Sequence, residues 1–129
     1  MRNEVRSGLD VLCEQFFAPL RGLRIGLVTH PAAVNSDLRH IKDLLAEAKG
    51  VHLAAVFGPE HGVFGEAQDL EGVAVRTADG VRIYSLYGDT VDSLKPTSEQ
   101  LQGLNALVID LQDVGSRYYT FQATMLYCF

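Results

Sequence analysis

Residues 23–57 read LRIGLVTHPAAVNSDLRHIKDLLAEAKGVHLAAVF, and two short apolar runs flank a helical pattern in this segment. The runs 23–29 and 51–57 have the length and the aliphatic composition of buried strands. The apolar residues that recur at helical spacing between them are Leu38, Ile41, Leu44, Leu45 and Ala48. We expect Asn35 or Ser36 to cap this helix. A strand, a helix and a strand in this order predict a βαβ unit with two parallel strands.

The rest of the chain extends this pattern. Strands are predicted at 81–87 and 106–111, and the second run is nearly continuously aliphatic, as in a parallel sheet covered on both faces. The TSEQ motif at 97–100 predicts a capping box that opens a short helix. Two terminal helices are predicted from the stripes Leu9, Leu12, Phe16, Leu20 and Tyr118, Phe121, Met125, Phe129. The sequence therefore predicts an α/β fold with a mostly parallel sheet, in one domain over residues 1–129.

The composition restricts the function. Of the 129 residues, 47% are hydrophobic and 21% are charged, as in a globular protein rather than a disordered one. The 11 Lys and Arg residues against 16 Asp and Glu residues argue against a surface that binds nucleic acid or anionic membrane. No run of 18 apolar residues and no signal peptide are found, so a cytoplasmic protein without a membrane span is expected. Cys13 and Cys128 are expected as reduced thiols.

The last predicted helix has no residue that would end it. No Gly, Pro or basic residue follows its last turn at Phe129, so we expect the chain to be truncated within a longer protein. Its apolar stripe would then be partly uncovered. Such a stripe favours self-association through this helix, or a mobile helix.

A polar cluster follows each predicted strand. The clusters are Thr29-His30-Pro31, Gly58-Pro59-Glu60-His61-Gly62, Tyr87-Gly88-Asp89 and Asp110-Leu111-Gln112-Asp113 with Gly115-Ser116-Arg117-Tyr118-Tyr119. Parallel strands end at one edge of a sheet, and ligands bind open α/β sheets at that edge. The four clusters therefore predict a binding site. The segment 58–80 has no helical period and is predicted as a functional loop.

Glu60 and His61 are the strongest catalytic candidates. Pro59 restricts the backbone before this pair and Gly62 allows a close approach after it, so Glu60 would be held in place. A carboxyl group at the end of a buried strand can acquire the raised pKa that a general acid requires. The alternative is a solvated pair of loop residues.

The residues after the last strand offer further binding groups. Asp113 could bind ligand hydroxyl groups or act as a second carboxylate, whereas Asp110 could be catalytic or cap the following turn. Arg117 could pair with one of these acids or bind a ligand carboxylate. Tyr118 and Tyr119 would point about 100° apart on a helix, so that one packs and the other faces the site.

No cofactor and no metal are predicted. The segment 58–65 does not match G-x-G-x-x-G, and the chain has neither a P-loop nor a G-x-S-x-G motif. His30 and His61 lack a third defined ligand and make only a weak zinc signal. His40 and His52 are assigned to a helix face and to a strand, without a functional role.

Several motifs together resemble one bacterial family. They are GLDVL at 8–12, RIGLVTHP at 24–31, FGPEHG at 57–62, YSLYG at 84–88 and DLQDVGSRYYT at 110–120. Their order is similar to that in the N-terminal domain of peptidoglycan exo-β-N-acetylmuramidases of the NamZ type, long known as a domain of unknown function. The resemblance covers essentially the whole chain.

The resemblance implies a Rossmann-like, three-layer domain that is followed in the family by a C-terminal domain, with the active cleft between them. It implies release of N-acetylmuramic acid from non-reducing ends of peptidoglycan fragments; the alternative is a non-catalytic sugar- or muropeptide-binding module. The resemblance implies Glu60 as the catalytic residue. We predict that Glu60 acts as the general acid and that His61 and Asp113 are further catalytic residues. The predicted substrate-binding residues are His30, Tyr87, Gln112, Arg117, Tyr118 and Tyr119. We expect the truncated chain to be without that C-terminal domain, and it departs from the family in His30, where many members have Asn.

Overall fold

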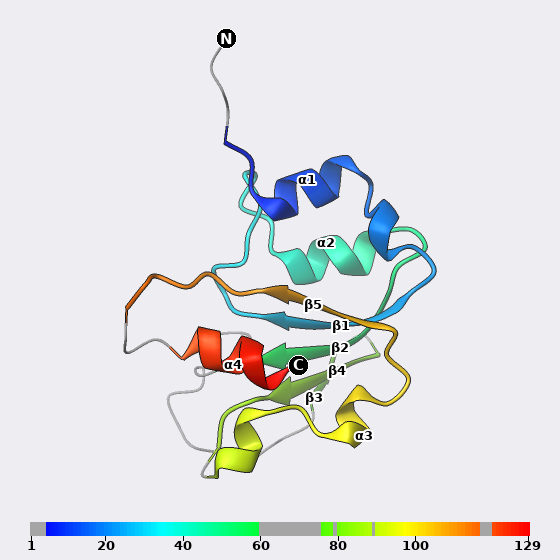
Figure 1. The fold of residues 1–129 in the computed structure, drawn as a ribbon. Coiled ribbons are helices and arrows are strands. Elements are labelled where there is room, and N and C mark those ends of the chain that lie inside the picture. Colours follow the sequence, from blue (N-terminus) through cyan, green and yellow to red (C-terminus); the bar gives the residue numbers. More distant parts are fainter. Residues whose placement is uncertain (1–4, 60–75, 79, 89, 117–119) are drawn as a thin grey trace.

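Four parallel strands form the centre of the computed structural model, which describes residues 5–59, 76–78, 80–88, 90–116 and 120–129 (Figure 1). In their order across the sheet they are β4 (Val81–Ser85), β2 (His52–Gly58), β1 (Arg24–Thr29) and β5 (Ala106–Asp110). A short strand β3 (Arg76–Ala78) pairs with β4 in the antiparallel direction. All four strands predicted from the sequence are confirmed, whereas β3 lies in the segment for which a loop is predicted.

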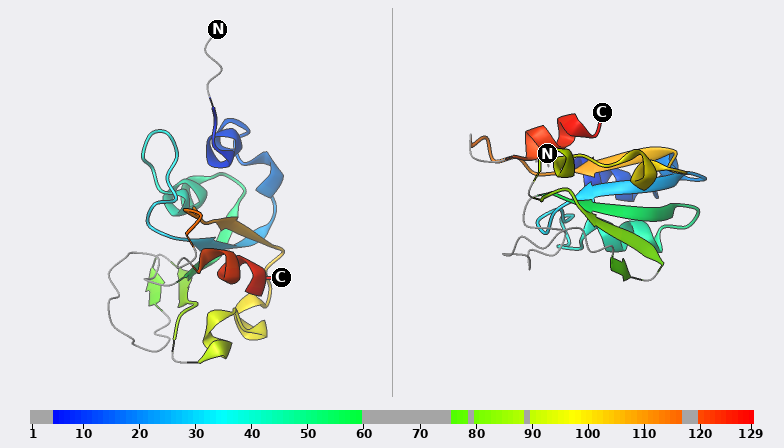
Figure 2. Two further views of the ribbon diagram at one scale, coloured as in Figure 1. Left: turned by 60° about the vertical axis from the view of Figure 1, so that its left-hand side comes forward. Right: turned by 90° about the horizontal axis from the view of Figure 1, so that it is seen from below.

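Helices cover both faces of this sheet (Figures 1 and 2). The helices α1 (Gly8–Glu14) and α2 (Ile41–Glu47) lie on one face, and α3 (Ser98–Leu101) and α4 (Phe121–Tyr127) lie on the other. Two short 3₁₀ turns, η1 (Ala18–Leu20) and η2 (Val91–Leu94), are also present. The predicted α/β fold with three layers is thus confirmed, and β1, α2 and β2 form the predicted βαβ unit.

The strand order reverses between β1 and β5. The chain leaves β1 through α2 on one face and enters β5 from α3 on the other face, so the connections diverge at this point. Val28 of β1 pairs with Phe57 of β2, and Thr29 pairs with Asp110 of β5. The carboxyl ends of β1 and β5 therefore meet at a topological switch point, which is where open α/β sheets bind ligands.

Alternation along the strands separates two apolar cores. The core below α1 and α2 contains Leu9, Phe17, Ile25, Leu27, Ala33, Ile41, Leu44, Leu45, Leu53 and Val56. The core below α3 and α4 contains Val28, Ala55, Phe57, Tyr84 and Leu86. In β2 the pairing register skips Ala54, and this bulge puts Leu53 and Val56 on the same face. Because both faces are buried, β1 and β2 read as nearly continuous apolar runs.

The first helix is shorter than its apolar stripe predicts. A capping box at Ser7 starts α1, but the helix ends at Glu14. Phe16 and Phe17 then adopt left-handed backbone conformations, with φ of 50° and 55°. This turn leaves Phe16 75% exposed and buries Phe17 in the core below α1 and α2. The stripe breaks because the chain changes direction before Pro19.

The second helix begins later than the sequence predicts. Leu38, the first residue of the predicted stripe, has a φ of 61° and is exposed. The cap of α2 is His40, whose Nδ1 accepts a hydrogen bond from the backbone N–H of Lys42 at 3.2 Å. Neither Asn35 nor Ser36 has the predicted capping role.

The buried face of α4 also differs from the predicted stripe. Phe121 and Thr124 are buried, and Cys128 packs against the same core. Met125 and Phe129 of the predicted stripe are exposed, in agreement with a stripe that is partly uncovered, whereas Thr124 lies outside that stripe. Positions 124 and 125 are adjacent on the helix surface, so sequence spacing alone does not select between these two faces. Self-association through the exposed residues stays a prediction.

The described residues also bear on the thiols and on membrane crossing. Cys13 and Cys128 are free, and they pack against opposite faces of the sheet, so a disulfide bond cannot join them. Within the described ranges, no helix is long and apolar enough to cross a membrane.

Candidate functional site at the carboxyl edge of the sheet

His30 is the first residue after β1 and lies at the switch point. It is only 7% exposed. Its ring packs edge-on against the ring of Phe121 in α4, with 4.9 Å between the centroids and 83° between the planes. This T-shaped arrangement is a favourable geometry for two aromatic rings. His30 thereby connects the end of β1 with α4.

Both ring nitrogens of His30 face protein. Nε2 accepts a hydrogen bond from the backbone N–H of Gln112, with 3.4 Å between the nitrogens. The proton of the neutral ring is therefore on Nδ1. Nδ1 is buried and has no hydrogen-bond partner among the described residues. The contacts of the ring in this structure are therefore with the backbone of Gln112 and the ring of Phe121.

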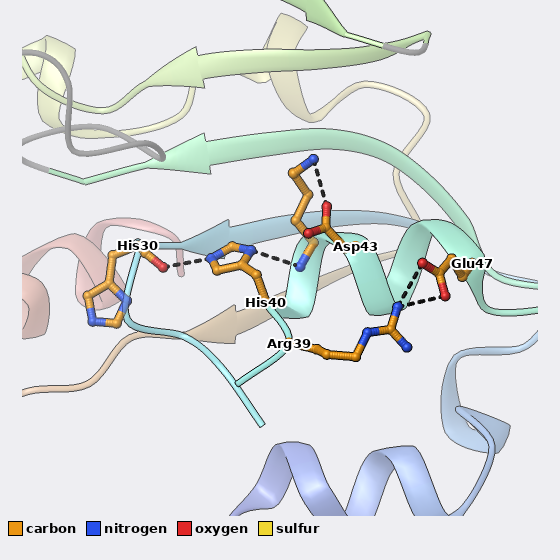
Figure 3. A network of polar contacts seen from close by, with 6 residues as sticks. His30, Arg39, His40, Asp43 and Glu47 are labelled. Atoms are coloured by element: carbon orange, nitrogen blue, oxygen red, sulfur yellow. Dashed lines mark hydrogen bonds and ion pairs between the residues drawn. The ribbon is translucent and has the colours of Figure 1, made fainter. Parts of the chain in front are cut away.

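The carbonyl oxygen of His30 is held by the loop 31–40. Nε2 of His40 donates a hydrogen bond to it at 2.9 Å, and the backbone N–H of Ala33 donates another at 3.2 Å. Figure 3 shows the ring of His40 between this carbonyl group and the start of α2, with the ring of His30 turned away from it. His40 donates from Nε2 because its Nδ1 accepts from the N–H of Lys42. His40 thus fixes both the end of β1 and the start of α2, whereas the sequence predicts only a position on the helix face for it.

The same loop is organised by Asn35. Its Oδ1 accepts hydrogen bonds from the N–H groups of Asp37 and Arg39, and its own N–H donates to the carbonyl of Arg39. The N–H of Ser36 donates to Asp10 of α1 at 2.9 Å. Asn35 therefore forms a turn by bonding to nearby backbone groups, as asparagine commonly does.

Burial determines the charge of His30. Burial lowers the pKa of His30, and this effect outweighs the nearby carboxylate of Asp110, which acts in the opposite direction. Burial likewise raises the pKa of Asp110, against the opposing influence of His30 and His40. His30 is therefore neutral at neutral pH, in agreement with an Nε2 atom that accepts a hydrogen bond.

Asp110 at the end of β5 and Asp113 in the segment after it have different surroundings. Asp110 is half-buried at the end of β5, and a carboxyl group with a raised pKa can act as a proton donor. Asp113 is exposed, and its Oδ1 accepts a hydrogen bond from the N–H of Gly115 at 2.6 Å. Gly115 adopts a φ of 71° in this turn, a left-handed backbone conformation that glycine accepts without a steric penalty. Asp113 shapes this turn, and its catalytic role stays a prediction.

The structure brings together three of the residues weighed in the sequence analysis, namely His30, Asp110 and Gln112. Tyr87 is exposed after β4. The side chain of Gln112 is exposed while its backbone binds His30. The predicted site residues that lie outside the described residues are Glu60, His61, Arg117, Tyr118 and Tyr119. Among the residues that are described, no three His, Cys, Asp or Glu side chains are arranged to hold a metal ion.

A parallel sheet covered by helices on both faces, with polar groups at its switch point, defines a Rossmann-like α/β domain. Residues 25–129 match the family model of the N-terminal domain of exo-β-N-acetylmuramidase NamZ. The chain therefore belongs to the NamZ N-terminal domain family, which is also called DUF1343.

Three relatives are similar over nearly the whole chain. The peptidoglycan β-N-acetylmuramidase NamZ of Bacillus subtilis (strain 168) is 46% identical over 126 residues, which cover 96% of this chain and 30% of that protein. A crystal structure of a DUF1343 family protein from Bacteroides fragilis has a TM-score of 0.82 and 40% identity, over 98% of this chain and 31% of its own. A second such protein from the same organism has a TM-score of 0.70 and 27% identity, over 97% and 30%. The chain thus spans about 30% of the length of these relatives.

Proposed function

We propose that this chain is the N-terminal part of a glycoside hydrolase that releases N-acetylmuramic acid from non-reducing ends of peptidoglycan fragments. The observation that carries this proposal is the 46% identity with a peptidoglycan β-N-acetylmuramidase over 96% of the chain. The polar switch point supports it, because a Rossmann-like domain binds its ligand there.

In this proposal Glu60 is the general acid. The strand β2 ends at Gly58 beside β1, and the buried Pro59 leads directly to Glu60. A general acid protonates the glycosidic oxygen as its bond to the sugar breaks, and such catalysis commonly contributes about 10²–10⁴ in rate. His61 and Asp113 complete the proposed catalytic group, with Asp113 as the second carboxylate of a glycosidase pair.

The remaining polar residues suit the groups of N-acetylmuramic acid. This sugar carries a lactyl carboxylate, and the guanidinium group of Arg117 can bind a carboxylate through two parallel hydrogen bonds. Tyr87 and Gln112 have exposed side chains that can bind hydroxyl groups. Tyr118 or Tyr119 would add a further hydroxyl contact or pack against the sugar ring.

The experiment separates turnover from binding. The 129-residue chain, and the longer protein wherever the gene encodes one, are incubated with the disaccharide of N-acetylmuramic acid and N-acetylglucosamine. Free N-acetylmuramic acid is measured by mass spectrometry, and binding is measured by calorimetry. Release of the sugar supports the hydrolase. Binding without release by both proteins supports a sugar-binding module instead, and the absence of both binding and release rejects the two functions together.

A further inference from the structure

The hydrogen bond from Gln112 to His30 connects residues that are 82 positions apart in the sequence. It crosses the switch point from the end of β1 to the segment 112–116 after β5. The hydrogen bond between Gly115 and Asp113 is internal to this segment, so it shapes the segment without attaching it to the sheet. The ring of His30 therefore provides an attachment of the segment to the central strand.

We propose that His30 is a positioning residue: its neutral ring anchors residues 112–116 at the switch point, and protonation of the ring releases them. The anchor stands on the contact between His30 and Gln112. Its consequence for catalysis rests on the proposed function, which assigns Gln112 and Asp113 to the site.

Only the neutral ring can make this contact. A proton on Nε2 of His30 would set one N–H donor against another, the N–H of Gln112, and two donors cannot form a hydrogen bond. The ring is also enclosed by protein and packed against Phe121, so a positive charge there would be costly. Protonation therefore opposes both the hydrogen bond and the burial that hold the ring in place.

The charged groups around the ring do not reverse this preference. The strand β5 contributes Asp110, which favours a positively charged ring, and the loop before α2 contributes His40, which opposes one. The titratable side chain of β2 is His52, which pairs with Arg24 at the end of β1 away from His30, and α4 contacts the ring through Phe121. Burial outweighs the attraction of Asp110, since the pKa of His30 is lowered.

Three substitutions distinguish an anchor from a merely packed residue. In His30→Gln the amide oxygen reaches the position of Nε2 and accepts the N–H of Gln112, but it does not titrate. In His30→Phe the ring and its contact with Phe121 remain, but the acceptor is lost. In His30→Asn the amide reaches only the position of Nδ1, so this conservative variant also loses the acceptor.

The test uses nuclear magnetic resonance on the ¹⁵N-labelled 129-residue chain between pH 8 and pH 5. We expect the Nδ1–H tautomer of His30 at pH 7, and an amide signal of Gln112 that moves with the same midpoint as the ring titrates. In His30→Gln the Gln112 signal should be independent of pH. In His30→Phe and His30→Asn, amide exchange of Gln112 at pH 7 should be about 5- to 10-fold faster than in His30→Gln, because one hydrogen bond is missing.

Two results would overturn the anchor: the Nε2–H tautomer at pH 7, or the same pH response of Gln112 in His30→Gln as in the unaltered chain. If the Phe and Asn variants do not fold, these two comparisons still decide the question.

Release of N-acetylmuramic acid is measured in parallel over the same pH range. Lost acid sensitivity of kcat in His30→Gln supports the catalytic consequence. If resonance confirms the anchor in the unaltered chain but turnover is unchanged in the Phe and Asn variants, only the catalytic consequence is rejected. If no protein turns over the substrate, the proposed function is rejected, and the anchor is still tested by the resonance measurements.

Discussion

Gly26 lies in the middle of β1, and replacing it with alanine tests how closely the sheet packs below α3. A Cβ atom at this position would lie 2.7 Å from Cδ2 of Leu107, 2.8 Å from Cδ1 of Leu104 and 3.0 Å from Cε2 of Phe57. Two of these distances are shorter than real Cβ contacts, so the neighbouring side chains must move.

The magnitude follows from how far these neighbours can move. Inserting a methyl group into a packed core typically costs about 1–3 kcal/mol. The ends of Leu104 and Leu107 are flexible, but the ring of Phe57 is fully buried and stacks on Tyr84 with 5.3 Å between centroids. We therefore expect Gly26→Ala to lower the free energy of unfolding by about 2–3 kcal/mol. For a domain of this size the melting temperature should fall by roughly 6–15 °C.

The assay is urea and thermal unfolding followed by circular dichroism. Gly8→Ala is the matched control, because Gly8 starts α1 and a Cβ atom there meets nothing within 4 Å. Alanine has the higher helix propensity, so this control should be neutral or slightly stabilising. Leu107→Ala should recover part of the loss when it is combined with Gly26→Ala. A Gly26→Ala protein within about 0.5 kcal/mol of the control, or no coupling to Leu107, would refute the packing argument.

Three further predictions concern stability near the site. Asp110→Asn should raise the free energy of unfolding at pH 7, because the raised pKa of Asp110 means that its ionisation destabilises the fold. This gain should disappear toward pH 3, where Asp110 is protonated in both states, and a lower free energy of urea unfolding at pH 7 would contradict the prediction. His40→Ala removes the cap of α2 and a hydrogen bond to the end of β1, so urea unfolding should show a loss of about 1–2 kcal/mol, whereas His40→Asn should retain part of the cap. Hydrogen bonds, first from Ser7, hold the pKa of Asp10 well below its usual range, so its stabilising effect is complete above the unfolded pKa near 4 and declines as the pH falls. The melting temperature of Asp10→Asn should therefore be lower at pH 6 and less sensitive to acid, and equal sensitivity would contradict this.

The strands could be predicted from the sequence because burial on both faces leaves a clear pattern. Residues 106–111 are nearly all aliphatic, since alternate side chains enter opposite cores. The capping box that starts α3 at Thr97 could also be predicted, whereas the end of α1 and the start of α2 could not, because they depend on local backbone geometry and on distant contacts. Phe16 and Leu38 fit helical stripes but adopt positive φ, and the loop containing Leu38 is fixed by the bond of Ser36 to Asp10.

The meeting of polar residues at one edge of the sheet could be predicted, but the contacts that they make there could not. Polar residues after each strand identify the carboxyl edge, and the register of Thr29 with Asp110 places them together. The bond between His30 and Gln112 depends on the pairing of β1 with β5, which no local pattern specifies. His40 likewise carries no capping signal, because Asn, Asp, Ser and Thr are the preferred caps.

The central claim is that Glu60 donates a proton to the glycosidic oxygen, and Glu60→Gln tests it most directly. The substitution keeps the size of the side chain and removes the acid. Release of N-acetylmuramic acid from the natural disaccharide should fall by about 10²–10⁴, with an unchanged circular dichroism spectrum. The loss should be much smaller for a nitrophenyl glycoside, because nitrophenolate departs with little protonation. A Glu60→Gln protein that retains near wild-type kcat on the natural disaccharide would contradict the claim.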